Sequence, residues 1–138
     1  MKVSTFRMME ALGEAEELRA VAQEYQEEFL SEPAHVYLER LLGEKQMTTA
    51  QMCERAGLGN YGYKLLSGVR KPSRDAALRI AVGLEMDMEQ AQRYLRLLGL
   101  ARLDPRCYRD ATVIFALGKK MDLARTQALL SEVGEAEL

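Results

Sequence analysis

Residues 48–73 read TTAQMCERAGLGNYGYKLLSGVRKPS. Thr48 and Gln51 have the spacing of a capping box, which marks the start of a helix. Gly57 then indicates a sharp turn, because glycine adopts a positive φ without a steric cost. A second short helix is expected over residues 59–66. The stretch therefore predicts two short helices joined by a turn.

The apolar residues of this stretch predict how the two helices pack. On the first helix Met52, Cys53 and Ala56 form the inward face, with Cys53 small where the helices approach each other, and Leu58 fills the turn. On the second helix Tyr63 and Leu66 lie three residues apart and are expected on the buried side. The outward residues of the second helix would then be Asn60, Tyr61, Lys64 and Leu65.

Charge is distributed unevenly along the 138 residues, whose net charge is −2. Residues 1–44 carry four basic and ten acidic residues, residues 45–80 seven and two, and residues 81–138 eight and nine. A basic segment in an acidic chain is typical of a protein that contacts a phosphate backbone. It is equally compatible with a solvated basic face, so charge alone leaves both interpretations open.

The remaining sequence predicts an all-α protein. No window alternates as a strand would, whereas helical periodicity and helix start and stop signals recur. No stretch reaches the apolar length of a transmembrane helix, and the first residues lack the apolar run of a signal peptide. Cys53 and Cys107 lie far apart outside any ligand pattern, which favours reduced thiols and a cytoplasmic location.

An acidic amphipathic helix is expected over residues 1–31. Its apolar stripe has steps of three and four residues and consists of Met8, Ala11, Ala15, Leu18, Ala22, Tyr25 and Phe29. Such a helix docks on its own domain, or it forms a dimer coiled coil or binds a partner protein. Ser31 is the expected cap of the next helix, with Pro33 in its first turn. That helix would bury Tyr37, Leu38, Leu41 and Leu42 and end at Gly43.

The C-terminal half contains an internal repeat. Residues 74–103 align without gaps with residues 109–138, and 12 of the 30 positions are identical. Each copy predicts a helix that stops at a glycine (Gly83, Gly118), an Asp-capped helix (Asp87, Asp122) and a glycine C-cap (Gly99, Gly134). Asp104 is the expected N-cap of the second copy, with Pro105 at its first helical position. Residues 101–138 are therefore expected to form a helical hairpin packed on residues 32–100.

Residues 33–98 resemble the five-helix unit of the lambda-repressor-like, Xre-type helix-turn-helix regulators. The resemblance rests on the Thr48 cap, the small Cys53, the turn residue Gly57, the apolar pair Tyr63 and Leu66, and GVRKPS at residues 68–73. A branch of these bacterial proteins also has PSRD after the loop and a second RD hairpin at the end. The resemblance implies a lambda-repressor-like bundle with an extra N-terminal helix and a C-terminal helical hairpin.

The resemblance also implies binding to double-stranded DNA through residues 59–66 in the major groove, by a homodimer on a palindromic site. Asn60 suits adenine, and Lys64 suits guanine or a phosphate. Tyr61 suits sugar or phosphate, and Leu65 a thymine methyl group. The expected phosphate contacts are Thr48, Thr49, Arg70, Lys71 and Ser73.

Two other classes of function are a protein-interaction module and an enzyme. The same fold can serve as a protein-interaction module, such as an adaptor or an antitoxin-like partner, and an exposed Tyr61–Leu65 pair is compatible with that role. An enzyme is not expected, since His35 is the single histidine and no cysteine pairs with it at metal-ligand spacing. The sequence predicts no metal site, no cofactor and no phosphate-cradling glycine loop.

Overall fold

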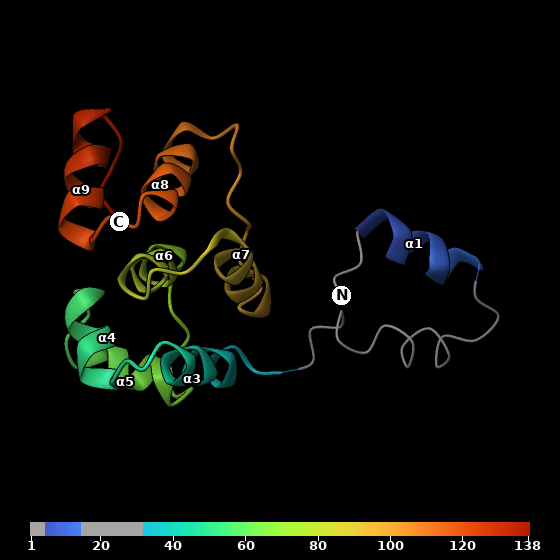
Figure 1. Ribbon diagram of the computed structural model, residues 1–138, viewed down its shortest axis with the longest axis horizontal. Coiled ribbons are helices and arrows are strands. Elements are labelled where there is room, and N and C mark those ends of the chain that lie inside the picture. Colours follow the sequence, from blue (N-terminus) through green and yellow to red (C-terminus); the bar gives the residue numbers. More distant parts are fainter. Residues whose placement is uncertain (1–4, 15–31) are drawn as a thin grey trace. The chain divides into compact units, whose positions relative to one another are not determined.

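The computed structural model describes residues 5–14 and 32–138, and within them the secondary structure is entirely helical (Figure 1). The expected all-α class is confirmed for this part of the chain. No helix there is long and apolar enough to cross a membrane. The helices are α1 (Thr5–Glu14), α3 (Ala34–Glu44), α4 (Thr49–Arg55), α5 (Tyr61–Leu66), α6 (Arg74–Gly83), α7 (Met88–Leu97), α8 (Tyr108–Gly118) and α9 (Leu123–Glu132).

The chain divides into two compact units, Met1–Ser31 and Glu32–Leu138. Of the first unit the structure describes α1, which includes Met8 and Ala11 of the predicted stripe. The rest of that stripe and the expected cap Ser31 lie outside the described residues. In the second unit α3 begins at Ala34 with Pro33 at the N-cap position.

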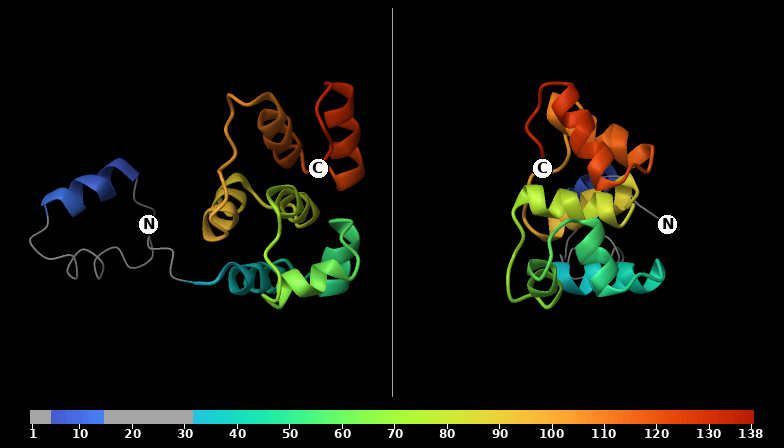
Figure 2. Two further views of the ribbon diagram at one scale, coloured as in Figure 1. Left: turned by 180° about the vertical axis from the view of Figure 1, so that it is seen from behind. Right: turned by 90° about the vertical axis from the view of Figure 1, so that its left-hand side faces the viewer.

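Helix α6 is the centre of the second unit. It lies between a tier formed by α3, α4 and α5 and a tier formed by α8 and α9 (Figures 1 and 2). Because α6 contacts α4, α7, α8 and α9, apolar residues are needed all around it. Its buried residues are Ala76, Ala77, Leu78, Ile80, Ala81, Val82 and Gly83. Val113, Leu117 and Leu130 of the C-terminal hairpin belong to the same core as Leu38 and Met52.

The N-caps predicted at Thr48, Asp87 and Asp122 are confirmed. Thr48 and Asp87 both form complete capping boxes, with Gln51 and Gln90 respectively. The Asp122 side chain accepts a hydrogen bond from the Arg125 amide at 2.8 Å. These bonds satisfy amide groups that the first turn of a helix leaves unpaired, and so they fix where α4, α7 and α9 begin.

Helices α6 and α8 end at Gly83 and Gly118, as predicted, whereas α3 ends at Glu44, one residue after the predicted Gly43. The left-handed residue after each helix is not a glycine but Gln46, Glu85 or Lys120, with φ between 51° and 54°. Gly83 is needed for packing, because a Cβ there would lie 3.0 Å from the Ala56 backbone nitrogen. Gly99 and Gly134 do have positive φ, as predicted.

The predicted helix start at Asp104 is also wrong. Helix α8 begins at Tyr108, and Cys107 occupies its N-cap position without a side-chain hydrogen bond. The Asp104 carboxylate accepts from the Arg106 amide at 2.9 Å, which closes a local turn. The Asp104 amide donates to the Asp110 carboxylate at 3.0 Å. These two bonds fix Asp104 in the connection that precedes α8.

The two repeat copies are joined by reciprocal ion pairs. Arg74 of the first copy donates to both carboxylate oxygens of Asp110 in the second, at 2.9 and 2.8 Å. Arg109 of the second copy donates to both oxygens of Asp75 in the first, at 2.9 and 3.2 Å. The structure shows that each pair crosses from one copy to the other.

Candidate nucleic-acid interface

Helices α4 and α5 pack together through one very close contact. A Cβ built on Gly62 would lie 2.5 Å from the Cys53 sulfur, so only glycine fits at this position. Cys53 is buried, as predicted, and burial raises the pKa of its thiol. Gly57 has a φ of 64°, in agreement with the predicted turn. Arg79 of α6 donates to the carbonyl oxygens of Ala56 and Gly57, both at 3.0 Å, and thereby fixes the turn on the core.

The predicted orientation of α5 is wrong. Gly62 and Leu65 form its buried side, whereas Tyr63 is 48% exposed and Leu66 is partly buried. Because Gly62 must face Cys53, the residue three positions later, Leu65, faces the same way. Leu65 is 2% exposed and therefore cannot contact a thymine methyl group as expected. The close approach at Gly62, rather than the largest apolar side chain, determines the orientation of this short helix.

The outward side of α5 carries the other predicted contact residues. Asn60, Tyr61 and Lys64 are exposed, and Tyr63 joins them. Tyr61 is 40% exposed. This tier of the unit lies on the side away from α8 and α9 (Figures 1 and 2). The side of α5 that points to solvent is thus built from an amide, two phenols and an ammonium group.

The loop that follows α5 has a defined conformation. The Arg70 amide donates to the Lys64 carbonyl oxygen at 3.2 Å, which ties the loop back to α5. Gly68 has a φ of 81°, and a Cβ there would lie 2.7 Å from the His35 ring. The loop is therefore held between α5 and α3, with the side chains of Arg70 and Lys71 exposed.

The predicted hydroxyl contacts serve first as helix caps. Thr48 Oγ1 accepts from the Gln51 amide and Ser73 Oγ from the Ala76 amide, both at 3.1 Å. A hydroxyl that accepts one bond retains its proton as a donor, so each can still donate to an anion. Thr49 is half-buried in the first turn of α4. The structure thus leaves the Thr48 and Ser73 hydroxyls as donors at the surface.

The basic residues of 45–80 fall into two groups. Arg74 and Arg79 donate to groups of the protein itself. In contrast, no carboxylate among the described residues lies within ion-pair distance of Lys64, Arg70 or Lys71. No carboxylate in the described part of the chain therefore competes with an external anion for these three cations.

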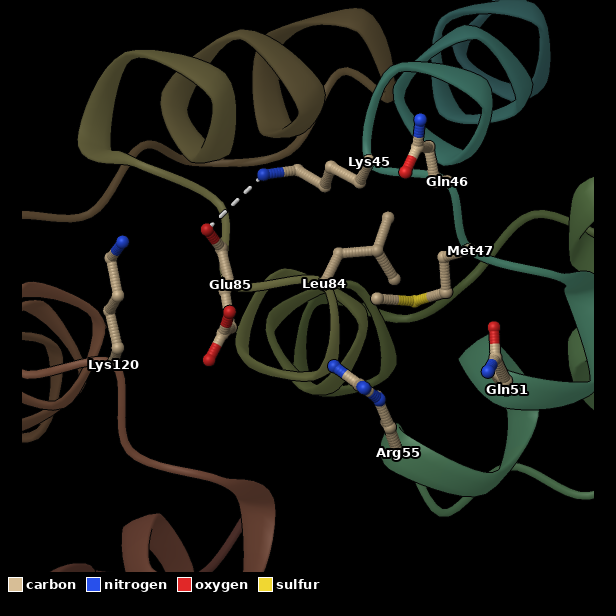
Figure 3. A pocket seen from close by; sticks show the side chains of 8 residues that line it. All are labelled: Lys45, Gln46, Met47, Gln51, Arg55, Leu84, Glu85 and Lys120. Carbon is tan, nitrogen blue, oxygen red and sulfur yellow. Dashed lines mark hydrogen bonds between the residues drawn. The ribbon is translucent and has the colours of Figure 1, made fainter.

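A second basic feature is a polar cleft of about 320 Å³ at the ends of α3, α6 and α8 (Figure 3). Lys45, Arg55 and Lys120 line it, and the Lys45 ammonium donates to the Glu85 carbonyl oxygen at 3.3 Å. Cations at helix C-termini stabilise the negative end of the helix dipole, which accounts for both lysines. The cleft was not predicted, although a Met followed by a cap residue occurs after each of α3, α6 and α8.

Comparison of the chain with protein-family models, with curated proteins and with solved structures finds no match. Within residues 5–14 and 32–138, no group of three or more His, Cys, Asp or Glu side chains is placed to hold a metal ion. The exposed side of α5 and the loop that follows it, with Arg70 and Lys71, form the candidate functional site.

Proposed function

We propose that the protein is a sequence-specific DNA-binding regulator of the lambda-repressor-like type, with α5 in the major groove. The observation that carries the proposal is the group Lys64, Arg70 and Lys71, which have no carboxylate partner among the described residues and border the exposed side of α5. A short helix packed against a preceding helix through a tight turn is the usual way to present side chains to base edges.

The exposed side chains have distinct roles in this proposal. Asn60 forms paired hydrogen bonds with an adenine, and Lys64 reaches a guanine or a phosphate. Arg70 and Lys71 bind phosphates on the flanking backbone, which positions α5 without reading sequence. Tyr61 and Tyr63 offer hydroxyl donors and flat rings to sugar and phosphate. Leu65 has no role in recognition, because it belongs to the core.

A homodimer forms part of the proposal, because one such unit contacts only a few base pairs. We assign dimerisation to residues 1–31, whose apolar stripe would pair with a second copy. Their acidic side chains would stay away from the phosphate backbone, which repels them.

The test is a salt series on duplexes recovered from a random-sequence selection. Each phosphate contact contributes about 0.9 to the slope of log affinity against log salt concentration. Arg70→Ala and Lys71→Ala should each lower the slope by about that amount and weaken all sequences alike. Asn60→Ala should instead relax base preference at one position, by about 1–3 kcal/mol. Lys120→Ala removes the same charge from the polar cleft and serves as the matched control.

A protein-interaction module is the second candidate, and one observation favours it. Tyr61, Tyr63 and Val69 are exposed together beside the cations, and tyrosine is enriched at protein interfaces. If a folded sample binds no duplex at about 50 mM salt, where electrostatic binding is strong, the DNA proposal is wrong and this candidate replaces it.

A further inference from the structure

A small pocket lies behind the loop that follows α5. Its volume is about 200 Å³, and it is bounded by the start of α3, the end of α5, the loop and the end of α7. Leu65, Leu97 and Leu98 supply apolar walls, whereas His35, Arg70 and Lys71 supply polar groups. The pocket is smaller than the roughly 300–1,000 Å³ typical of sites for drug-sized ligands. It therefore suits a small molecule with an apolar body.

Tyr94 of α7 also lines this pocket. The residue is 2% exposed, yet its hydroxyl forms no hydrogen bond with any described residue. Among the described residues, no buried side-chain polar atom is both sealed from solvent and unpaired. The Tyr94 oxygen must therefore reach accessible space, and the pocket is the cavity that Tyr94 lines.

The Tyr94 hydroxyl differs from three other buried polar side chains, which are paired within the protein. Thr112 and Thr126 donate to backbone carbonyl oxygens, and Asp110 is held by Arg74. Phenylalanine would pack as well as Tyr94 without placing a hydroxyl group beside the apolar walls of the pocket. Burial also raises the pKa of Tyr94, so the group is a neutral donor. A donor in an apolar pocket is matched by a ligand that brings an acceptor oxygen.

We propose that this pocket binds a small apolar carboxylate, whose oxygen accepts from the Tyr94 hydroxyl and whose charge is balanced by Arg70 and Lys71. The leucine walls disfavour inorganic phosphate, because most of its oxygens would lose their hydrogen bonds there. A neutral apolar molecule would leave both the hydroxyl and the cations without a partner. The combination of apolar walls, one buried donor and cations selects an amphipathic anion.

The site has a consequence that rests on the proposed DNA-binding function. Arg70 and Lys71 line the pocket and are also the proposed phosphate contacts. A carboxylate in the pocket would neutralise charge that the DNA backbone requires, so ligand and DNA should bind with negative coupling.

The binding site is tested first without DNA, by titrating the full chain with octanoate and following backbone amide signals by NMR. Saturable shifts are expected at Leu65, Tyr94 and Leu97. Octanol has the same chain without the charge, and acetate has the charge without the chain. Both should bind at least about tenfold more weakly than octanoate. No saturable shift in this region, or equal binding of octanol and octanoate, would overturn the proposal.

Two variants test the role of the Tyr94 hydroxyl and of the free volume in the pocket. Tyr94→Phe should weaken octanoate binding by about tenfold. Tyr37→Phe, at a buried tyrosine that does not line the pocket, should leave binding unchanged. Ala34→Leu, at a half-buried position on the pocket wall, should abolish binding by filling the space. Unchanged octanoate affinity in Tyr94→Phe would show that the hydroxyl is not part of a site.

The coupling is tested by repeating the DNA titration with saturating octanoate. We expect weaker DNA binding for the wild-type protein and a smaller effect for Tyr94→Phe. If octanoate binds but DNA affinity does not change, the coupling is wrong and the site stands. If no duplex binds at all, the DNA proposal fails, while the NMR titration still decides whether the carboxylate site exists.

Discussion

The reciprocal ion pairs between the repeat copies allow one prediction to be worked out with an internal control. Arg74→Met and Arg109→Met remove equivalent side chains. Each arginine donates twice to a carboxylate and also to two backbone carbonyl oxygens: Ala101 and Arg102 for Arg74, and Ala136 and Glu137 for Arg109. The lost backbone bonds therefore match. The two variants differ in the carboxylate left behind.

The exposure of that carboxylate sets the size of the effect. The Asp110 side chain is 7% exposed, whereas the Asp75 side chain is 45% exposed. Leaving a buried charge unpaired costs about 3 kcal/mol or more, whereas an exposed pair is worth about 1 kcal/mol or less. Arg74→Met should therefore lower the free energy of unfolding by about 2 kcal/mol more than Arg109→Met. For a unit of this size that corresponds to a Tm difference of about 8 °C.

The same pair predicts a dependence on pH. Burial alone would raise the pKa of Asp110, but hydrogen bonds from Arg74 and from the Asp104 amide hold it below its ordinary value. A carboxyl group with a lowered pKa in the folded state stabilises the protein above the unfolded pKa, about 3.9. That contribution is lost as pH falls through the folded pKa. In Arg74→Met this acid-dependent loss should shrink, because Asp110 no longer has the arginine.

The measurement is urea unfolding followed by circular dichroism, at neutral pH and across the acid range. Asp110→Asn in the Arg74→Met background should recover part of the loss, because a neutral amide tolerates burial better than an unpaired carboxylate. Equal destabilisation by Arg74→Met and Arg109→Met would refute the reasoning, since burial of the carboxylate would then have no influence.

Two further predictions concern packing and assembly. Gly62→Ala should lower the free energy of unfolding by roughly 1–3 kcal/mol, because the added methyl group overpacks the contact with the Cys53 sulfur. The decrease should be smaller in a Cys53→Ala background. If urea unfolding gives the same decrease in both backgrounds, the Cys53 sulfur is not the obstacle. Deleting residues 1–30 should leave a folded monomer with weakened DNA binding. Deleting residues 104–138 should instead uncover apolar residues of α6, which α8 and α9 contact, and cause aggregation. Light scattering that finds a stable dimer without residues 1–30 would place dimerisation elsewhere.

The helix boundaries that depend on local chemistry could be predicted from the sequence. The caps at Thr48, Asp87 and Asp122 bond to amides three residues away, so a short pattern of residues is sufficient to determine them. The positive φ at Gly57, Gly99 and Gly134 follows from a property of glycine itself. The duplication was equally visible, since identical residues at a constant offset need no knowledge of the fold.

The orientation of α5 could not be predicted in the same way. The spacing of the apolar residues Tyr63 and Leu66 predicted that this pair is buried. Gly62 and Leu65 are buried instead, because α5 can approach Cys53 this closely only where a residue lacks a Cβ. That contact joins two helices. As a result Leu65 lies in the core and not in the candidate site, and Tyr63 lies at the surface.

Partners that are distant in sequence were decided by the tertiary structure alone. The repeat in the sequence by itself determined that the Arg–Asp dipeptides at 74–75 and 109–110 occupy equivalent helix starts. The sequence also determined that residues 45–80 are predominantly basic. Only the packing of α6 against α8 decided that Arg74 binds Asp110 and Arg109 binds Asp75. The same packing directs Arg74 inward while Lys64, Arg70 and Lys71 remain exposed. Local patterns specify hydrogen bonds within a turn of helix, whereas a side chain's burial and its ionic partner depend on which helices meet.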